Sequence, residues 1–174
     1  MSRILTFALS IVALAAFAPA ADAQRRAAPA REPFSFRDWH VGDAFNPEDH
    51  RFLRCTPIPA GNACVFTDDR IAGVDARQIG AAFGRDGLFA LEAKFPRDSF
   101  GIVEAALNDR YGPPCEQRTR QVRNRLLESF SSRVRVWCFS DGRATLSERL
   151  DHIDESAFEF ATHDADRQAA INDF

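Results

Sequence analysis

The sequence predicts an α+β domain: an antiparallel, meandering sheet with one major helix packed on one face, a short C-terminal helix and two disulfides. Three observations predict this class. Apolar and polar residues alternate in short runs that flank Asp–Gly turns, which is typical of β-hairpins. The segment 96–114 instead has the apolar spacing of a helix. The chain also has four cysteines, an even count that favours disulfides in an exported protein.

Export is indicated by residues 1–23, which are typical of a secretory signal peptide. Arg3 precedes an apolar run, and Ala21 and Ala23 place small residues where a signal peptidase cleaves. The apolar run is shorter than the roughly 20 residues that span a bilayer. We therefore expect cleavage after Ala23, a periplasmic or secreted protein, and no transmembrane segment in the mature chain.

The rest of the chain divides into a tail and one domain. Residues 24–33 are rich in Ala, Arg and Pro without apolar periodicity, and predict a flexible tail. Residues 34–174 are long enough for a single domain with its own core. The formal net charge of −3, together with export, argues against nucleic acid as a partner.

The first half of the domain predicts strands. Phe34 and Phe36 alternate with polar residues in a first strand, and Asn46-Pro47 favours a turn. The runs "RFLRC" and "CVFTDDRIAG" predict a hairpin around the loop "TPIPAGNA" (56–63). Residues 76–84 and 88–95 predict a second hairpin around Asp86-Gly87, with Phe89, Leu91 and Phe95 on one apolar face.

The helix expected after residue 96 has start and stop signals. Asp98 or Ser99 can cap its amino end, Gly112 suits the C-cap, and Pro113-Pro114 prevents continuation. Its apolar stripe consists of Phe100, Val103, Leu107 and Tyr111, widened by Ile102 and Ala106.

The second half again predicts strands. A polar strand opens at Cys115, and a hairpin over 131–150 turns at Asp141-Gly142. A final strand follows at 156–162, and a terminal helix is expected to be capped near Asp164.

Four short patterns carry a resemblance: "IAGV-A", "F--DG-L", "F--V--AL---YG-P" and "W---DG--TL--R". Over roughly residues 50–160 the chain resembles a loose group of uncharacterised exported proteobacterial proteins. Its plan is also similar to the small outer-membrane-protein assembly lipoproteins, but it lacks their lipidated Cys and their paired N-terminal helices. The resemblance implies a small periplasmic α+β domain and no named activity.

The cysteines could be structural, redox-active or metal-binding. Cys55 and Cys64 lie in a strand–turn–strand context, with a spacing that fits neither a thioredoxin-type site nor the usual zinc pairs. We expect a disulfide across that hairpin, and a second between Cys115 and Cys138 in the strands that follow the helix.

Catalytic motifs are weak. No two of the four histidines have the spacing that places a metal pair on one helix face, and the chain has no G-x-S-x-G motif. Adjacent carboxylates such as Asp68-Asp69 fall in expected turns. Gly80, Gly84 and Gly87 lie on a hairpin and form no phosphate loop. We predict no cofactor and no metal.

The charge pattern suggests a binding surface. In "RVRVWCF", alternation places two Arg side chains on the same strand face as aromatic rings, and two further Arg residues fall on the neighbouring strand. Guanidinium groups pair with carboxylate or phosphate and stack on rings. The predicted partner-binding residues are Arg118, Arg120, Arg133, Arg135 and Trp137.

These observations favour a non-enzymatic exported binding or envelope-accessory module, whose partner is a protein or an anionic envelope component. The alternative is a cell-envelope hydrolase, or an inhibitor of one that inserts the disulfide-closed loop 56–63 into an active site. A third hypothesis is a purely structural envelope protein. The alternative interpretation of the charge pattern is that the Arg residues only solvate the face and pair with the acidic C-terminal third.

Overall fold

The computed structural model describes residues 32–68, 70–123, 128–150 and 153–165. The predicted signal peptide, most of the predicted tail and the last nine residues lie outside the described residues. No helix in the described part of the chain is long and apolar enough to span a membrane.

The predicted α+β class is wrong, because the described residues are mostly β. Strands hold 56% of them and helices 14%. The strands are longer than the sequence indicated: the expected loop 56–63 is almost entirely strand, with Pro59 and Ala60 alone at the turn. The turn is short because backbone pairing continues from Cys55↔Cys64 outward to Ile58↔Gly61.

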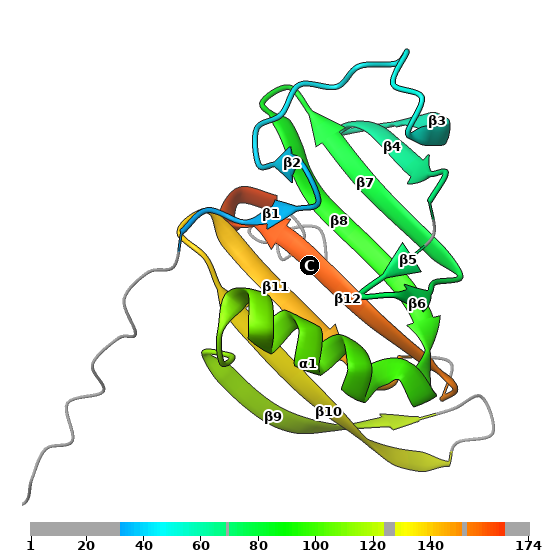
Figure 1. The fold of residues 1–174 in the computed structure, drawn as a ribbon, viewed down its shortest axis with the longest axis vertical. Coiled ribbons are helices and arrows are strands. Elements are labelled where there is room, and N and C mark those ends of the chain that lie inside the picture. The colour runs from blue at the N-terminus through cyan, green and yellow to red at the C-terminus, as the bar shows by residue number, and fades with distance from the viewer. Residues whose placement is uncertain (1–31, 69, 124–127, 151–152, 166–174) are drawn as a thin grey trace, which may run out of the picture.

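One antiparallel sheet of eight strands forms the body of the molecule, in the order β3-β4-β7-β8-β12-β11-β10-β9 (Figure 1). Its strands are β3 (Phe52–Ile58), β4 (Gly61–Phe66), β7 (Gln78–Gly84), β8 (Gly87–Pro96), β9 (Glu116–Arg123), β10 (Ser129–Cys138), β11 (Gly142–Ser147) and β12 (Glu155–Thr162). The sheet consists of two four-stranded meanders that meet where β12 pairs with β8.

The helix joins the two meanders. A 3-10 turn, η1 (Arg97–Ser99), leads into α1 (Phe100–Tyr111), which lies across one face of the sheet over the second meander (Figure 1). Phe100, Val103 and Leu107 are buried as the stripe predicted, whereas Ile102 is 56% exposed. Gly112 ends the helix at a φ of 73°, in the left-handed region that favours glycine.

Two small hairpins cover the same face above the first meander, β1 (Ser35–Phe36) with β2 (Trp39–His40), and β5 (Arg70–Ile71) with β6 (Val74–Asp75) (Figure 1). The single first strand expected from "FSFRDWHVG" is therefore a tight hairpin, in which Arg37 adopts a φ of 56°. Its backbone is tied to the β10–β11 turn, because the Phe34 N–H donates to the Asp141 carboxylate at 3.0 Å.

The core lies between the sheet and these covering elements. Phe34 stacks on Phe160 with ring centroids 3.9 Å apart, and Trp39 contacts Phe52 and Phe83. The apolar face predicted for β8 is confirmed at Leu91 and Phe95, which are buried, whereas Phe89 is half-buried. The opposite face of the sheet, which we call the open face, carries neither α1 nor the two small hairpins (Figure 1).

A further helix begins near the C-terminal end of the described chain. Residues 163–165 are helical, and the Ala165 N–H donates to the Thr162 hydroxyl at 3.3 Å. Thr162 therefore makes the side-chain cap that was expected near Asp164. The remainder of the predicted C-terminal helix lies outside the described residues.

Candidate functional site

The five predicted partner-binding residues do not share a face. In the β9–β10 register, Arg118 lies opposite Val134 and Arg120 opposite Ser132. Directly opposed residues of an antiparallel pair project to the same side, and neighbours along a strand project to opposite sides. Arg118 and Arg120 therefore belong to the open face, while Arg133 and Arg135 belong to the face covered by α1.

Arg133 and Arg135 attach the helix to the sheet. The Arg135 Nε donates to Glu104 Oε1 on α1 at 2.5 Å, with both side chains largely buried. The Arg133 Nε donates to Glu148 Oε2 at 3.1 Å, and its guanidinium lies 4.5 Å from the Phe100 ring centroid. The Glu148 pKa is lowered, although desolvation opposes the effect of these Arg133 hydrogen bonds. Both arginines thus have structural partners.

Trp137 is not an exposed aromatic, and that part of the prediction is wrong. Its side chain is 0% exposed, and its indole N–H donates to the Gly112 carbonyl at 2.8 Å. The sequence was ambiguous here because both sides of β10 carry apolar residues, Val134 and Val136 on one and Trp137 and Phe139 on the other. Alternation alone does not say which side the helix covers.

Two residues that the sequence analysis missed join Arg118 and Arg120 on the open face. Arg149 follows β11, and its guanidinium lies 5.9 Å from the Phe130 ring centroid. The Ser132 hydroxyl fixes this segment, since it accepts from the Arg149 N–H at 2.9 Å and donates to the Arg149 carbonyl at 3.0 Å. No local motif marks Arg149, because it reaches β10 only when the chain turns back after β11.

We call this group of residues, Arg118, Arg120, Arg149 and Phe130, the β9 patch. The Arg120 Nη2 donates to the Arg149 carbonyl at 3.3 Å, and Arg118 Nη1 lies 3.4 Å from Glu116 Oε1. The Arg118 and Glu116 side chains are 59% and 46% exposed, so water screens this ion pair. The charge of Arg120 also acts on the Glu159 carboxylate and that of Arg149 on Glu148, and the Arg149 Nη1 donates to the Ser131 carbonyl. Arg118 and Arg120 remain exposed, and their guanidinium groups can bind anions.

A shallow depression of about 460 Å³ lies on the same open face, over β7, β8 and β12. Small residues line it, among them Gly80, Ala82 and Ala90. Glu92 and Glu159 are cross-strand partners there, and Lys94 Nζ lies 2.8 Å from Glu92 Oε1. Desolvation, and then the charge of Glu92, raises the pKa of the Glu159 carboxyl. No histidine, serine or cysteine lines this depression.

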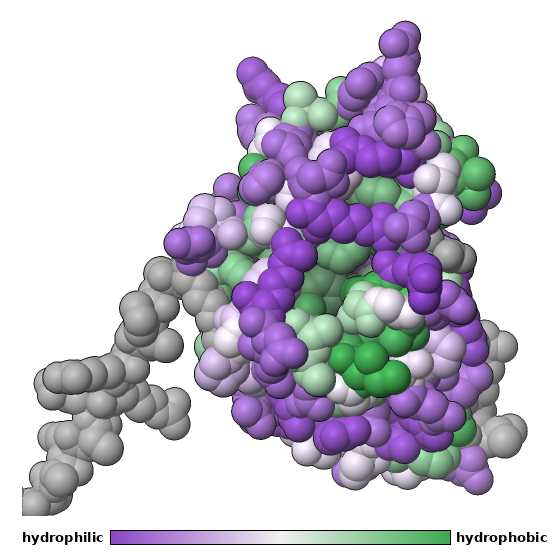
Figure 2. All heavy atoms as spheres, in the orientation of Figure 1, coloured by the Kyte–Doolittle hydropathy of each residue, from purple (hydrophilic) through white to green (hydrophobic). Residues whose placement is uncertain are grey.

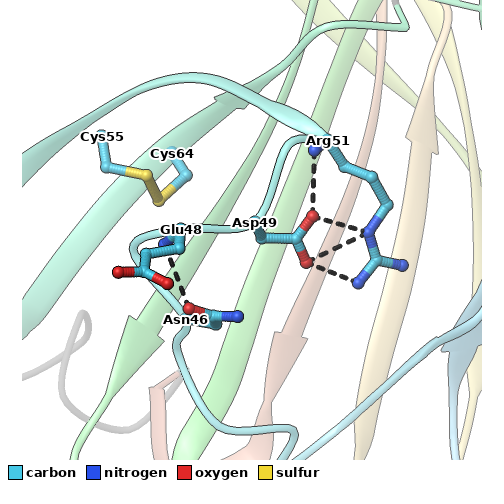
Figure 3. The surroundings of a disulfide bond; sticks show 6 residues. All are labelled: Asn46, Glu48, Asp49, Arg51, Cys55 and Cys64. Atoms are coloured by element: carbon cyan, nitrogen blue, oxygen red, sulfur yellow. Dashed lines mark hydrogen bonds and ion pairs between the residues drawn. A yellow bond between two sulfur atoms is a disulfide. The ribbon is translucent and has the colours of Figure 1, made fainter.

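The disulfides match the predicted pairs. Cys55–Cys64 joins directly opposed residues of β3 and β4 (Figure 3), and Cys115–Cys138 ties the chain just before β9 to the end of β10. All four cysteines are oxidised, which leaves none as a free thiol. Two disulfides indicate an oxidising, non-cytoplasmic environment.

The described histidines lie apart along the chain: His40 in β2, His50 before β3 and His163 after β12. His152 lies outside the described residues. Among the described residues, no group of three or more His, Cys, Asp or Glu side chains is placed to hold a metal ion.

Comparison of the chain with protein-family models, curated proteins and solved structures finds no match. Its function is therefore inferred from the geometry of the site.

Proposed function

We propose that this protein is a non-enzymatic, exported binding module that holds an anionic partner on the β9 patch. The observation that carries the proposal is that Arg118 and Arg120, both exposed, project from one face beside Arg149 and the half-buried Phe130 ring. The periplasm, or the medium outside the cell, is the compartment we infer from the signal-like segment 1–23 together with the disulfides.

On the face that α1 covers, the arginines already have partners within the fold, which leaves the β9 patch as the proposed binding surface. Arg133 and Arg135 already pair with Glu148 and Glu104, so their charge is balanced within the fold. Arg118 pairs with Glu116 in an exposed contact, and the charge of Arg120 acts on Glu159, but both arginine side chains stay exposed. A partner that carries carboxylates or phosphates would add charge-assisted hydrogen bonds at this surface without displacing any pair that holds the fold together.

The inhibitor alternative loses the feature on which it was based. Its insertion loop was to be residues 56–63, but these residues form strands β3 and β4 around a two-residue turn. Pairing with β4 and the Cys55–Cys64 disulfide hold β3 within the sheet, so the segment does not protrude as a loop.

Binding to a defined polyanion tests the proposal. Fluorescence anisotropy with labelled poly-L-glutamate measures the affinity of the mature, disulfide-bonded protein at low and at physiological salt. We expect saturable binding that weakens as salt screens the charges. The double variant Arg118→Glu, Arg120→Glu is expected to lose at least about tenfold in affinity, equivalent to about 1.4 kcal/mol.

Arg54→Glu with Arg85→Glu is the matched control, because it changes the net charge by the same amount. Both residues are exposed, on β3 and in the β7–β8 turn, away from the β9 edge of the sheet. We expect less than about a twofold change for this control. Equal losses in the two variants, or no binding by the unchanged protein, would overturn the proposal.

A further inference from the structure

The two edges of the sheet differ in their capacity to accept another strand. β3 forms one edge and β9 the other. β3 contains Pro57, which has no N–H to donate, and its register shifts between Phe52 and Arg54. A proline and a bulge on an edge strand are devices that prevent further pairing. The β3 edge is therefore protected by its own backbone.

β9 has neither device. Its eight residues include no Pro or Gly, and they pair with β10 in an unbroken register from Glu116↔Val136 to Arg123↔Ser129. Glu116–Gln121 are all exposed. Within the described residues, no strand lies beyond β9, and its backbone bonds only to β10. In an antiparallel edge strand, alternate residues direct their N–H and C=O groups outward, where a further strand can bond to them.

The charges of β9 select what can pair there. Arg118 and Arg120 are two residues apart and project from the same face, so an added strand would place alternate side chains beside them. Acidic residues at these alternate positions would meet both guanidinium groups. A second copy of β9 is a poorer occupant, because each copy brings three Arg and one Glu to the junction.

We propose that the anionic partner is an extended peptide segment with acidic residues at alternate positions, which binds by adding a strand along the free edge of β9. This proposal rests on the proposed function and makes it specific. Main-chain hydrogen bonds to β9 supply affinity, and the Arg118 and Arg120 side chains supply the preference for acidic residues. Phe130 and Arg149 border the same surface and extend it toward β10.

Peptides of equal composition test this inference. The first is a short peptide in which Thr and Glu alternate, and the second has the same residues in two blocks. We expect the alternating peptide to bind at least about tenfold more tightly. N-methylation of one alternate set of its amides should abolish binding, whereas N-methylation of the other set should be tolerated, because only one set faces β9. Hydrogen exchange should show new protection at alternate amides of Glu116–Arg123.

The outcomes separate this inference from the proposed function. If the block peptide binds as well and both N-methylated forms are tolerated, while Arg118→Glu with Arg120→Glu still abolishes binding, the patch binds anions but not by strand addition. If neither the peptides nor poly-L-glutamate binds, both proposals fail. If sedimentation of the free protein shows a dimer that Arg118→Glu with Arg120→Glu changes, a second copy occupies the edge and the inference is wrong.

Discussion

Arginine side chains serve different purposes in this protein according to the element that faces them. Arg135 and Glu104 are largely buried together, and join β10 to α1. Arg118 is 59% exposed and its neighbour Glu116 is nearly as exposed, so their pair contributes little to stability. A ligand that took Arg135 away from Glu104 would leave a buried carboxylate without its partner, which is costly. Only the exposed arginines are therefore available to a ligand.

Asp49 and Arg51 form an ion pair with several hydrogen bonds in the loop before β3. The Arg51 Nη2 donates to Asp49 Oδ2 at 2.6 Å and its backbone N–H to Asp49 Oδ1 at 2.9 Å (Figure 3). The Arg51 guanidinium also lies 4.2 Å from the Trp39 ring centroid, so the pair fastens this loop to the core.

The Asp49 pair predicts how stability depends on pH. The Arg51 hydrogen bonds lower the Asp49 pKa from 3.8 to about 2. A lowered folded-state pKa means that the stabilisation is fully present above about pH 4 and is lost as the pH falls toward 2. We expect Asp49→Asn to lower the free energy of unfolding by about 1 kcal/mol at pH 7, with a smaller effect at pH 2. Urea unfolding at a series of pH values measures it.

Asp38 provides the control for that experiment. Its carboxylate also contacts Arg51, but its side chain is 72% exposed. We expect Asp38→Asn to change stability at pH 7 by less than about half as much as Asp49→Asn. If the two variants lose equal stability, or if Asp49→Asn is as costly at pH 2 as at pH 7, the pair does not act as described.

At the scale of elements, two glycines have opposite roles. Gly87 begins β8 at a φ of 89°, and a Cβ placed there would lie 2.3 Å from the Gly42 backbone. Gly101 lies in the first turn of α1, where a Cβ would meet nothing within 4 Å. The turn at Gly87 requires the residue that has no side chain, whereas the helix would gain from one.

We therefore predict opposite effects for the same substitution in these two elements. Gly87→Ala should destabilise the protein by about 2 kcal/mol or more, because the left-handed backbone and the contact with Gly42 both oppose it. Gly101→Ala should stabilise it by about 0.5 kcal/mol through helix propensity. Denaturant unfolding of both variants checks this, and a neutral Gly87→Ala would show that the turn is not held against Gly42.

The exposed apolar surface shown in Figure 2 lies on the other side of the sheet from the β9 patch. Figure 2 shows the face that α1 covers, with hydrophobic surface gathered near its middle inside a hydrophilic rim. Ile102 on α1 is among the large apolar side chains exposed in the described structure. The β9 patch belongs to the open face, on the other side of the sheet. The proposed binding surface is therefore separate from this apolar region.

The two disulfides make stability of the whole domain depend on the compartment. They close segments with sequence separations of 9 and 23 residues, one in each meander. We expect reduction to lower the free energy of unfolding by about 3 kcal/mol or more, because the unfolded chain regains its freedom. Denaturant unfolding with and without reductant measures this loss.

Peptide mapping of the protein complements that measurement. We expect the linkages Cys55–Cys64 and Cys115–Cys138, and a mature chain that begins at Gln24. A different linkage, or a stability that reduction leaves unchanged, would contradict this account. Uncleaved protein would instead remove the argument for export while leaving the disulfides in place.

What the sequence alone decides about this protein is local. The Asp86-Gly87 turn, the end of α1 at Gly112 and the Cys55–Cys64 pairing follow from residues close together in the chain, and the structure has each of them. The cap expected from Asp98 or Ser99 makes no side-chain hydrogen bond, and a 3-10 turn leads into the helix instead. Turn chemistry and the glycine that ends a helix act over a few residues, so a single sequence carries their signal.

Only the tertiary structure decides which side of each strand is covered. β10 has apolar residues on both sides, so its pattern does not reveal that α1 packs over Trp137 and Arg135 rather than over Val134. The register with β9 then places Arg118 and Arg120 on the open face, and the return of the chain after β11 brings Arg149 to Phe130. These positions depend on contacts between residues distant in sequence, and alternation within one strand carries no information about them.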